Sequence, residues 1–229
     1  MLKVWGRNTS SNVQKVMWVI GELGLEHERF DVGGTFGKNR EPAYLSMNPN
    51  GLVPTLQDGD FILWESNAII RYLARGHDGG KLEGTSPEMT ALAHQWMDWQ
   101  LTVVGPAITP AFHGLIRTPE EKRDLAAIAA SQTKTTEAMK ILDAQLGKTS
   151  HVAGDQFTIG DIPVGVMAYR FWQLVPQHPD LPHLQRWYKS LQQRDAFRTA
   201  VEAVPLTKES LVLSMIFSEN RFPLFGIML

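Results

Sequence analysis

The sequence predicts a two-part α/β plus all-α fold, in which a mixed α/β domain precedes an all-helical domain. Strand-like and helix-like apolar patterns alternate over roughly the first 75 residues in the order β-α-β-α-β-β-α. From Pro87 onward the strand patterns disappear and apolar residues recur at helical spacing. We expect residues 1–76 and 87–205 to form these two domains and residues 206–229 to form an apolar C-terminal tail.

Composition restricts the class of function. The 229 residues include 22 basic and 24 acidic side chains, with a net charge of −2 and no block of like charges. This balance argues against nucleic acid or an anionic membrane surface as the main partner. No stretch has the apolar length of a signal peptide or of a membrane span, so we expect a soluble cytoplasmic protein. The chain has no cysteine, which excludes disulfides and a cysteine nucleophile and requires any reacting sulfur to come from the ligand.

The first domain should begin with a β-α-β unit. Leu2–Trp5 predicts a strand, and apolar residues at helical spacing between Val13 and Leu23 predict the helix that follows. Residues 27–32 predict a second strand, parallel to the first because a helix makes the crossover. A short helical turn is expected at residues 41–45.

The stretch NPNGLVPTLQDGDFILWESN contains several structural signals. Val53-Pro54 follows a turn and is a bond of the type that adopts the cis form at modest cost. A proline at the start of a strand would leave the backbone of Val53 outside ladder pairing. Residues 55–57 and Phe61–Trp64 predict a hairpin, and residues 66–75 predict the closing helix, followed by a linker at residues 76–80.

The second domain should consist of helices. Gly105, Pro106 and Pro110 should kink or interrupt the first helix, and Pro119 should begin a second long helix that ends at Gly147. Aromatic residues at helical spacing should lie mainly in the core: Trp96, Trp99, Phe112, Phe171 and Trp172.

Later in the chain, Thr158 and Asp161 have capping-box spacing, with Asp161 in place of the usual Glu, ahead of an apolar helix that ends at Leu174. Residues 182–193 and 196–203 predict two further helices.

The polar loop at residues 7–12 offers a first candidate site. Ser10 stands just before a helix, where it serves either as an N-cap or as a hydrogen-bond donor to a bound thiolate. A hydrogen bond to a charged group contributes about 1.5–3 kcal/mol, which would lower a thiol pKa by about one to two units from about 8.5. Asn12 offers an amide N–H to the same place, or is itself the N-cap.

A second candidate site combines the unpaired backbone at Val53 with Glu65 and Ser66 at a helix N-terminus. These groups would suit a ligand that carries both a carboxylate and an ammonium group, although an ordinary hairpin and capped helix explain the same residues. The motifs of serine hydrolases, zinc proteases and phosphate-binding loops are absent. The histidines have no metal-ligand spacing, so we expect no metal.

Taken together, these motifs resemble the cytosolic glutathione S-transferases, in particular bacterial members with a serine or asparagine thiol loop. The likeness rests on Ser10-Ser11-Asn12, NPNGLVPTL, the Glu65-Ser66 pair and the Thr158 to Asp161 box, and covers about residues 2–204. It implies a thioredoxin-like N-terminal domain and a helical domain with a hydrophobic substrate pocket. It also implies a homodimer that uses glutathione as its co-substrate without a metal.

The resemblance also implies roles for single residues in glutathione binding. The Val53 backbone, beside a cis Pro54, would pair with the cysteinyl part of glutathione, and Glu65 and Ser66 would hold its γ-glutamyl group. Lys38 or Arg40 would reach the glycyl carboxylate.

For the thiol itself, Ser10 falls where serine-type members place the activating hydroxyl, and Asn12 falls where a group of bacterial members places an asparagine. Gly51 stands where some serine-type members carry a histidine that contacts glutathione, so we expect that contact to be missing.

The favoured function is therefore a detoxifying glutathione transferase that activates the glutathione thiol for attack on small hydrophobic electrophiles. One alternative is a glutathione-dependent disulfide or peroxide reductase on the same scaffold. The other is a non-catalytic glutathione-binding protein, for which loss of the thiol loop or of the Glu65-Ser66 pair would be expected. Both features are present.

Overall fold

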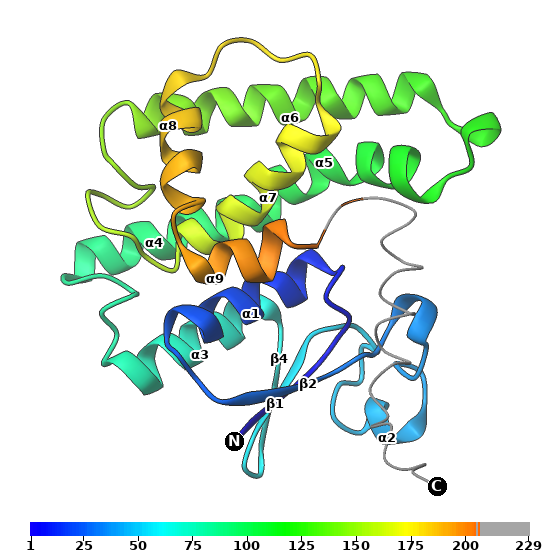
Figure 1. Ribbon diagram of the computed structural model, residues 1–229, viewed down its shortest axis with the longest axis vertical. Coiled ribbons are helices and arrows are strands. Elements are labelled where there is room, and N and C mark those ends of the chain that lie inside the picture. Colours follow the sequence, from blue (N-terminus) through cyan, green and yellow to red (C-terminus); the bar gives the residue numbers. More distant parts are fainter. Residues whose placement is uncertain (205, 207–229) are drawn as a thin grey trace, which may run out of the picture.

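The computed structural model describes residues 1–204 and Leu206 (Figure 1), so the expected tail at residues 206–229 lies outside the described residues except for Leu206. The first part of the chain forms a four-stranded mixed sheet with the strand order β2-β1-β3-β4. β1 and β2 are parallel, as predicted, and the other neighbours are antiparallel. The strands are β1 (Leu2–Trp5), β2 (His27–Phe30), β3 (Thr55–Asp58) and β4 (Phe61–Trp64).

β2 ends at Phe30 instead of extending to residue 32. Its partner β1 has already ended at Trp5, and the carbonyl of Val32 accepts a hydrogen bond from the loop residue Arg7 (3.0 Å).

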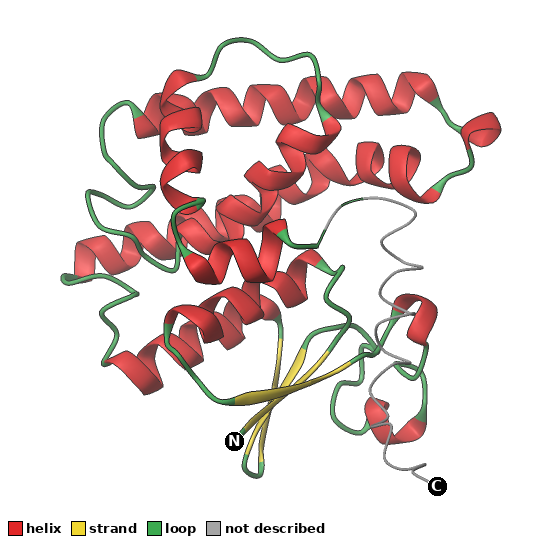
Figure 2. Ribbon diagram, in the orientation of Figure 1, coloured by secondary structure: helices red, strands yellow, loops and turns green. Residues whose placement is uncertain are grey.

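Three helices complete the first part: α1 (Ser11–Glu22), the short α2 (Pro42–Leu45) and α3 (Ser66–Asp78). α1 and α3 pack together between the sheet and the helical domain (Figure 2), whereas α2 lies away from them. α3 continues past residue 75 into the expected linker and ends only at its C-cap, Gly79, which adopts the left-handed conformation (φ 67°).

The second part consists of helices joined by loops, one of which holds an isolated β-bridge between His151 and Gly154. None of the helices in the described residues has both the length and the apolar character that a membrane span requires. The helices of the second part are α4 (Pro87–Trp99), α5 (Gly105–Phe112), α6 (Leu125–Leu146), α7 (Asp161–Leu174), α8 (Pro182–Leu191) and α9 (Asp195–Phe197). π-helical turns follow α4 at Gln100–Val104, α5 at His113–Arg117 and α9 at Arg198–Glu202.

One predicted helix boundary changes in this part. The expected interruption of the first helix near Pro106 and Pro110 is present, because π-helical turns lie on either side of α5, which contains both prolines. The expectation that α6 begins at Pro119 is wrong. Pro119 precedes a 3₁₀ turn, and α6 begins at Leu125 because the Asp124 carboxylate caps it, accepting a hydrogen bond from the N–H of Ala127 (2.9 Å).

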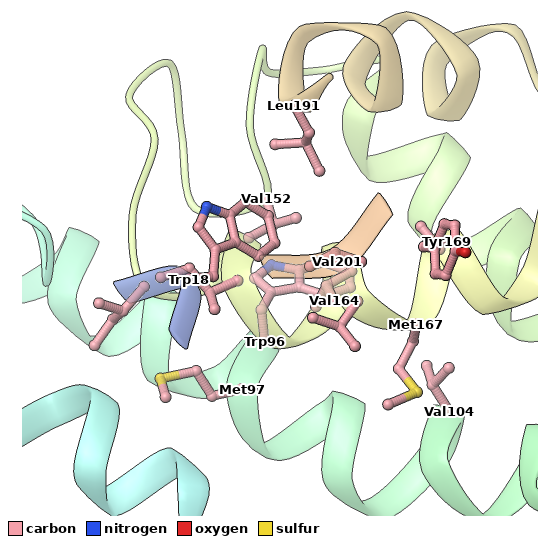
Figure 3. Close-up of a cluster of buried hydrophobic side chains, with 14 of the residues drawn as sticks. Trp18, Trp96, Met97, Val104, Val152, Val164, Met167, Tyr169, Leu191 and Val201 are labelled. Atoms are coloured by element: carbon pink, nitrogen blue, oxygen red, sulfur yellow. The ribbon is translucent and has the colours of Figure 1, made fainter. Parts of the chain in front are cut away.

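α7 is the centre of the core, with nearly all of its residues buried. Its side chains pack against those of α1, α4, α8 and the last π turn (Figure 3). Trp18 of α1 packs directly against α7 at Gly165, where an added Cβ would lie 2.8 Å from the indole ring. Of the aromatic residues expected in the core, three are buried and two are partly buried: Trp96, Phe112 and Phe171, and Trp99 and Trp172 respectively.

A charged contact adds to this junction between the two parts. Arg194, which precedes α9, donates two hydrogen bonds to the Glu22 carboxylate at the end of α1 (both 2.7 Å). Its guanidinium lies 3.7 Å from the ring centroid of Phe157, and the Trp18 indole N–H also donates to Glu22 (2.8 Å). The bidentate geometry holds the C-terminal end of α1 against the helical domain.

The Thr158 to Asp161 box forms, with a modified pattern. The Asp161 carboxylate accepts from the N–H of Thr158 (2.9 Å), while the Thr158 hydroxyl accepts from Gly160 instead of Asp161 (3.2 Å). Asp161 is fully buried and also accepts from the N–H of Val152 (3.1 Å) and the indole N–H of Trp187 (2.8 Å). One carboxylate therefore ties the start of α7 to the preceding loop and to α8.

Replacement of this carboxylate should be strongly destabilising. Asp161→Ala leaves three buried N–H donors without an acceptor, so we expect the free energy of unfolding to fall by about 3–5 kcal/mol in urea denaturation. The matched control is Asp180→Ala, at an exposed position, which should change it by no more than about 0.5 kcal/mol. Similar losses in both variants would contradict the role assigned to Asp161.

A buried lysine also joins the two parts. Lys15 of α1 is fully buried, and its Nζ donates to Oε1 of Gln100 in the π turn after α4 (2.7 Å). Burial, followed by the charge of Arg170, lowers the pKa of Lys15 from 10.5 to about 7, and Glu65 opposes this shift.

This shift makes stability depend on pH. Between about pH 7 and 10.5 the unfolded chain holds a proton that folded Lys15 releases, so this group makes the free energy of unfolding rise with pH across that window. The slope is at most about 1.36 kcal/mol per pH unit. Lys15→Met combined with Gln100→Leu removes both partners, so its free energy of unfolding should rise less than that of the parent between about pH 7 and about pH 9.5.

The measurement is urea denaturation at the two pH values, with Lys140→Met, at an exposed position, as the control. Equal pH dependence in the parent and the double variant would show that Lys15 does not titrate in this window.

Candidate functional site

The predicted site residues gather at one edge of the sheet. β1 and β4 end at this edge and β3 begins there, because β3 is antiparallel to both neighbours. Trp5, Thr55 and Trp64 are paired across the three strands, so the segments adjoining them are also neighbours. These segments are the loop before α1, Val53-Pro54, and the Glu65-Ser66 pair. The register of the sheet therefore brings together residues that lie far apart in the sequence.

Val53 lies outside the strand ladder, and its peptide bond to Pro54 is cis, as the resemblance implies. Buried side chains fix the preceding turn: the Tyr44 hydroxyl and the Asn48 amide both donate to the carbonyl of Leu52 (2.6 and 2.9 Å). Among the described residues, neither the N–H nor the carbonyl of Val53 makes a hydrogen bond. Both groups are thus available to a ligand at the edge.

The first loop places Ser10 at the N-cap position of α1, where its hydroxyl makes no capping hydrogen bond. The interpretation of Asn12 as the N-cap is wrong, because the Ser10 carbonyl already accepts the first intrahelical bond from Gln14 (2.9 Å). Instead, Oδ1 of Asn12 accepts a hydrogen bond from the Ser66 hydroxyl (3.3 Å). The two candidate sites recognised in the sequence are therefore in direct contact.

Glu65 and Ser66 mark the start of α3. Ser66 is buried, whereas Glu65 is exposed and has a positive φ (72°), a conformation that costs a residue with a side chain about 1–3 kcal/mol. Strained backbone of this kind is concentrated at ligand-binding sites.

Lys38 and Arg40 follow the 3₁₀ turn Gly34–Phe36. Nη1 of Arg40 donates to the carbonyl of Asn50 in the turn before Val53 (3.3 Å). Gly51 has a positive φ (60°), and an added Cβ would lie 2.8 Å from the backbone carbonyl oxygen of Asn39, so a larger side chain does not fit. Lys38 is exposed, and although its carbonyl accepts a hydrogen bond from the N–H of Glu41 (3.1 Å), its ammonium group makes no hydrogen bond or ion pair with a described residue. The structure therefore does not link the Lys38 side chain to the other candidates.

Three arginines near this edge were missed in the sequence: Arg7, Arg117 and Arg170. Arg7 lies in the loop before α1 and packs on Gly34, where an added Cβ would be 2.9 Å from its side chain. Arg170 of α7 and Arg117 at the end of the π turn after α5 face the same Phe112 ring. A signal for Arg170 was present, because it is the one charged residue in the apolar run IPVGVMAYRFWQL.

These arginines influence one another electrostatically. Burial and the charges of Arg117 and Arg7 lower the pKa of Arg170 to about 10, and burial and Arg117 lower the pKa of Arg7. Burial and the charges of Arg117 and Arg170 lower the pKa of His113. Because a pKa of about 10 is far above neutral pH, Arg170 remains charged and the region carries a concentrated positive charge.

Comparisons with known proteins agree with the fold and with the resemblance. Residues 1–75 match the glutathione S-transferase N-terminal domain model, and residues 126–190 match the C-terminal domain model. The chain is 43% identical over 203 residues to glutathione S-transferase GstB of Escherichia coli K12, covering 88% of this chain and 98% of that protein. It is 30% identical over 215 residues to glutathione S-transferase 3 of Zea mays, with 90% and 95% of the two chains covered.

A solved structure provides the same comparison in three dimensions. The theta class glutathione S-transferase of Xanthomonas axonopodis pv. citri, with glutathione bound, superimposes with a TM-score of 0.84 at 44% identity, covering 87% of this chain and 96% of that one. The predicted combination of a thioredoxin-like domain with a helical domain is confirmed. These findings show that the chain belongs to the glutathione S-transferase family and is a glutathione transferase.

Proposed function

We propose that the chain binds glutathione at the described sheet edge and activates its thiol as a thiolate, which attacks small hydrophobic electrophiles. In this proposal residues 1–76 bind glutathione and residues 87–205 supply the hydrophobic pocket. The observation that carries the proposal is the convergence of the Ser10 loop, Val53 and the Glu65-Ser66 pair on one edge, with Asn12 and Ser66 hydrogen-bonded. The glutathione bound to the Xanthomonas relative supports the choice of ligand.

Each part of glutathione has a matching group. The unpaired N–H and carbonyl of Val53 pair with the cysteinyl backbone in the manner of a short antiparallel strand. The Glu65 carboxylate receives the γ-glutamyl ammonium, and Ser66 with the N-terminal N–H groups of α3 receives the γ-glutamyl carboxylate. Lys38 or Arg40 binds the glycyl carboxylate. Within residues 1–204 no cluster of three His, Asp or Glu side chains is arranged to hold a metal ion.

Ser10 is the proposed activator of the thiol. Its hydroxyl makes no capping bond and stands at the positive end of α1, so it can donate to a thiolate. The thiol proton leaves to solvent, the sulfur forms a bond to the electrophilic carbon, and the leaving group departs with its bonding electrons. Asn12 acts as a positioning residue, because its side chain accepts the hydrogen bond from Ser66.

Removal of the Ser10 hydroxyl tests this assignment. Ser10→Ala should raise the pKa of bound glutathione by about one to two units, because one hydrogen bond to the anion is lost. Asn12→Ala should raise it less, and Ser11→Ala, at the first position of α1, serves as the matched control. The measurement is a pH titration of thiolate ultraviolet absorbance in the bound complex.

The reverse order for Ser10 and Asn12 would make Asn12 the activator. An unchanged thiol pKa on binding to the parent chain would refute the proposed mechanism as a whole. Parallel assays with a chloronitrobenzene and with a mixed disulfide of glutathione distinguish the transferase from the reductase alternative, which predicts turnover of the disulfide alone.

We also propose that the protein acts in the cytoplasm as a two-fold homodimer. Large apolar side chains remain exposed on the isolated chain, notably Leu52, which is 60% exposed directly beside Val53. Further exposed apolar residues are Phe61, Leu101 and Val103. Burial of such residues against a second copy would stabilise the pair.

Leu52 provides a test of the dimer. In a two-fold interface each substitution is present twice, so Leu52→Ala should weaken the free energy of dimer association by about 3 kcal/mol or more. The dimer dissociation constant should then rise about a hundredfold. Sedimentation equilibrium measures this change. Leu125→Ala on α6, where the leucine is 71% exposed, is the control and should leave the constant unchanged. A monomeric parent chain, or equal effects of the two variants, would contradict this interface.

A further inference from the structure

The three arginines noted above, Arg7, Arg117 and Arg170, form an arginine cluster drawn from both parts of the chain. Among the described residues, none of the three makes an ion pair. Other arginines of the same chain do find carboxylates, namely Arg29, Arg71, Arg75, Arg194 and Arg198. Arg40, Arg123 and Arg186 also lack a carboxylate partner, but each donates a hydrogen bond to a backbone carbonyl. Within residues 1–204, the three arginines of the cluster are distinguished by side chains that make neither an ion pair nor a hydrogen bond.

Arg170 is the buried member of the cluster, and its charge is therefore the most costly to leave without a partner. It is only 6% exposed, and its buried Nε has no hydrogen-bond partner among the described residues. Its guanidinium carbon lies 4.4 Å from the centroid of the Phe112 ring. A cation–π contact contributes about 0.5–2 kcal/mol, whereas burial of an unpaired charge costs several kcal/mol. Stacking alone does not offset that cost, which indicates that an anion completes the arrangement.

The other two arginines lie where they reach the same anion. The guanidinium carbon of Arg117 is 5.2 Å from the centroid of the same Phe112 ring, and α5 and α7 pack beside one another (Figure 1). Arg7 lies three positions before Ser10 in the loop. A Cβ added at Gly33 would lie 3.1 Å from Nη1 of Arg7 and 3.3 Å from the Val53 side chain, so Arg7 borders the proposed glutathione site. The cluster thus connects the thiol edge with the helical domain.

We propose that the arginine cluster binds the carboxylate of the second substrate. The preferred electrophiles then carry a carboxylate group in addition to the carbon that the thiolate attacks. A planar guanidinium pairs with a carboxylate through two parallel hydrogen bonds, which fixes orientation as well as position. This inference rests on the proposed function. In the reaction, the thiolate sulfur bonds to the carbon that bears the halogen, and halide leaves with the bonding electrons. The thiol proton goes to solvent.

The test compares two electrophiles that differ in one charge: 4-chloro-3,5-dinitrobenzoate and 4-chloro-3,5-dinitrobenzamide. Both undergo displacement of chloride by the thiolate. Relative to the uncatalysed rates, the parent chain should favour the benzoate. Arg117→Met and Arg170→Met should each lower kcat/KM for the benzoate about tenfold or more and leave kcat/KM for the benzamide within about twofold. Lys140→Met removes one positive charge from an exposed site on α6 and should change neither value.

Binding of the conjugates provides a readout without catalysis. Calorimetry should show that the glutathione conjugate of the benzoate binds the parent chain about tenfold or more tighter than the conjugate of the benzamide. Arg117→Met should abolish this preference; this arginine is exposed, so its replacement leaves the core intact even where Arg170→Met does not fold. Arg117→Lys should restore part of the preference, because it restores the charge without the bidentate geometry.

Several results would overturn the inference. If Arg117→Met and Arg170→Met lower kcat/KM equally for the benzoate and the benzamide, the cluster only supports the structure, or a carboxylate of the chain itself neutralises it. A higher KM for glutathione with both electrophiles would assign the cluster to a carboxylate of glutathione. If the chain binds glutathione but turns over neither electrophile, the proposed function fails, and the preference between the two conjugates still decides the inference.

Discussion

The close approach of Trp18 to Gly165 positions α1, and the geometry of the site depends on α1. One side of α1 covers the sheet with α3, and the opposite side packs on α7 and α9. A methyl group at Gly165 would lie 2.8 Å from the indole ring, so the glycine is required for this packing. The bidentate pair between Glu22 and Arg194 holds the other end of the helix. Because α1 is held from both sides, the loop at its N-terminus has a defined position between the two parts of the chain.

This arrangement places the proposed thiol donor in a region of positive potential. Ser10 stands at the positive end of the α1 dipole, and Arg7 lies in the same loop. Arg170 is fixed by α7, which α1 contacts directly. Nearby cations favour the anionic form of any group that binds among them. Arg7, which lies in the thiol loop itself, would therefore also favour a thiolate, whereas Arg117 and Arg170 face Phe112 in the helical domain and are assigned to the second substrate. Lys15 contributes less, because burial lowers its pKa to about 7 and leaves it partly neutral.

Much of the fold could be predicted from local sequence patterns. β1 and β4 have the predicted ends, the parallel pairing of β1 with β2 follows from the crossover helix, and Thr158 and Asp161 form a modified cap. The errors have local causes as well. α6 begins at Leu125 because the Asp124 carboxylate caps it, and β2 ends at Phe30 because the carbonyl of Val32 accepts a hydrogen bond from the loop residue Arg7. In each case a competing local interaction replaced the expected one.

The order of elements and the absence of cysteine chemistry can be read from the amino-acid sequence alone, and so can the candidate residues Ser10, Val53, Glu65 and Ser66. These features are visible because turn residues, caps and apolar periodicity act over a few positions. The contact between Asn12 and Ser66 and the proximity of Arg7, Arg117 and Arg170 become visible only in the folded chain. The strand register brings Asn12 and Ser66 together across more than 50 positions of the sequence. The packing of α1 on α7 brings Arg7 near Arg117 and Arg170, each more than 100 positions away. No local pattern records such contacts, because they arise from the burial of apolar surface shared by distant elements.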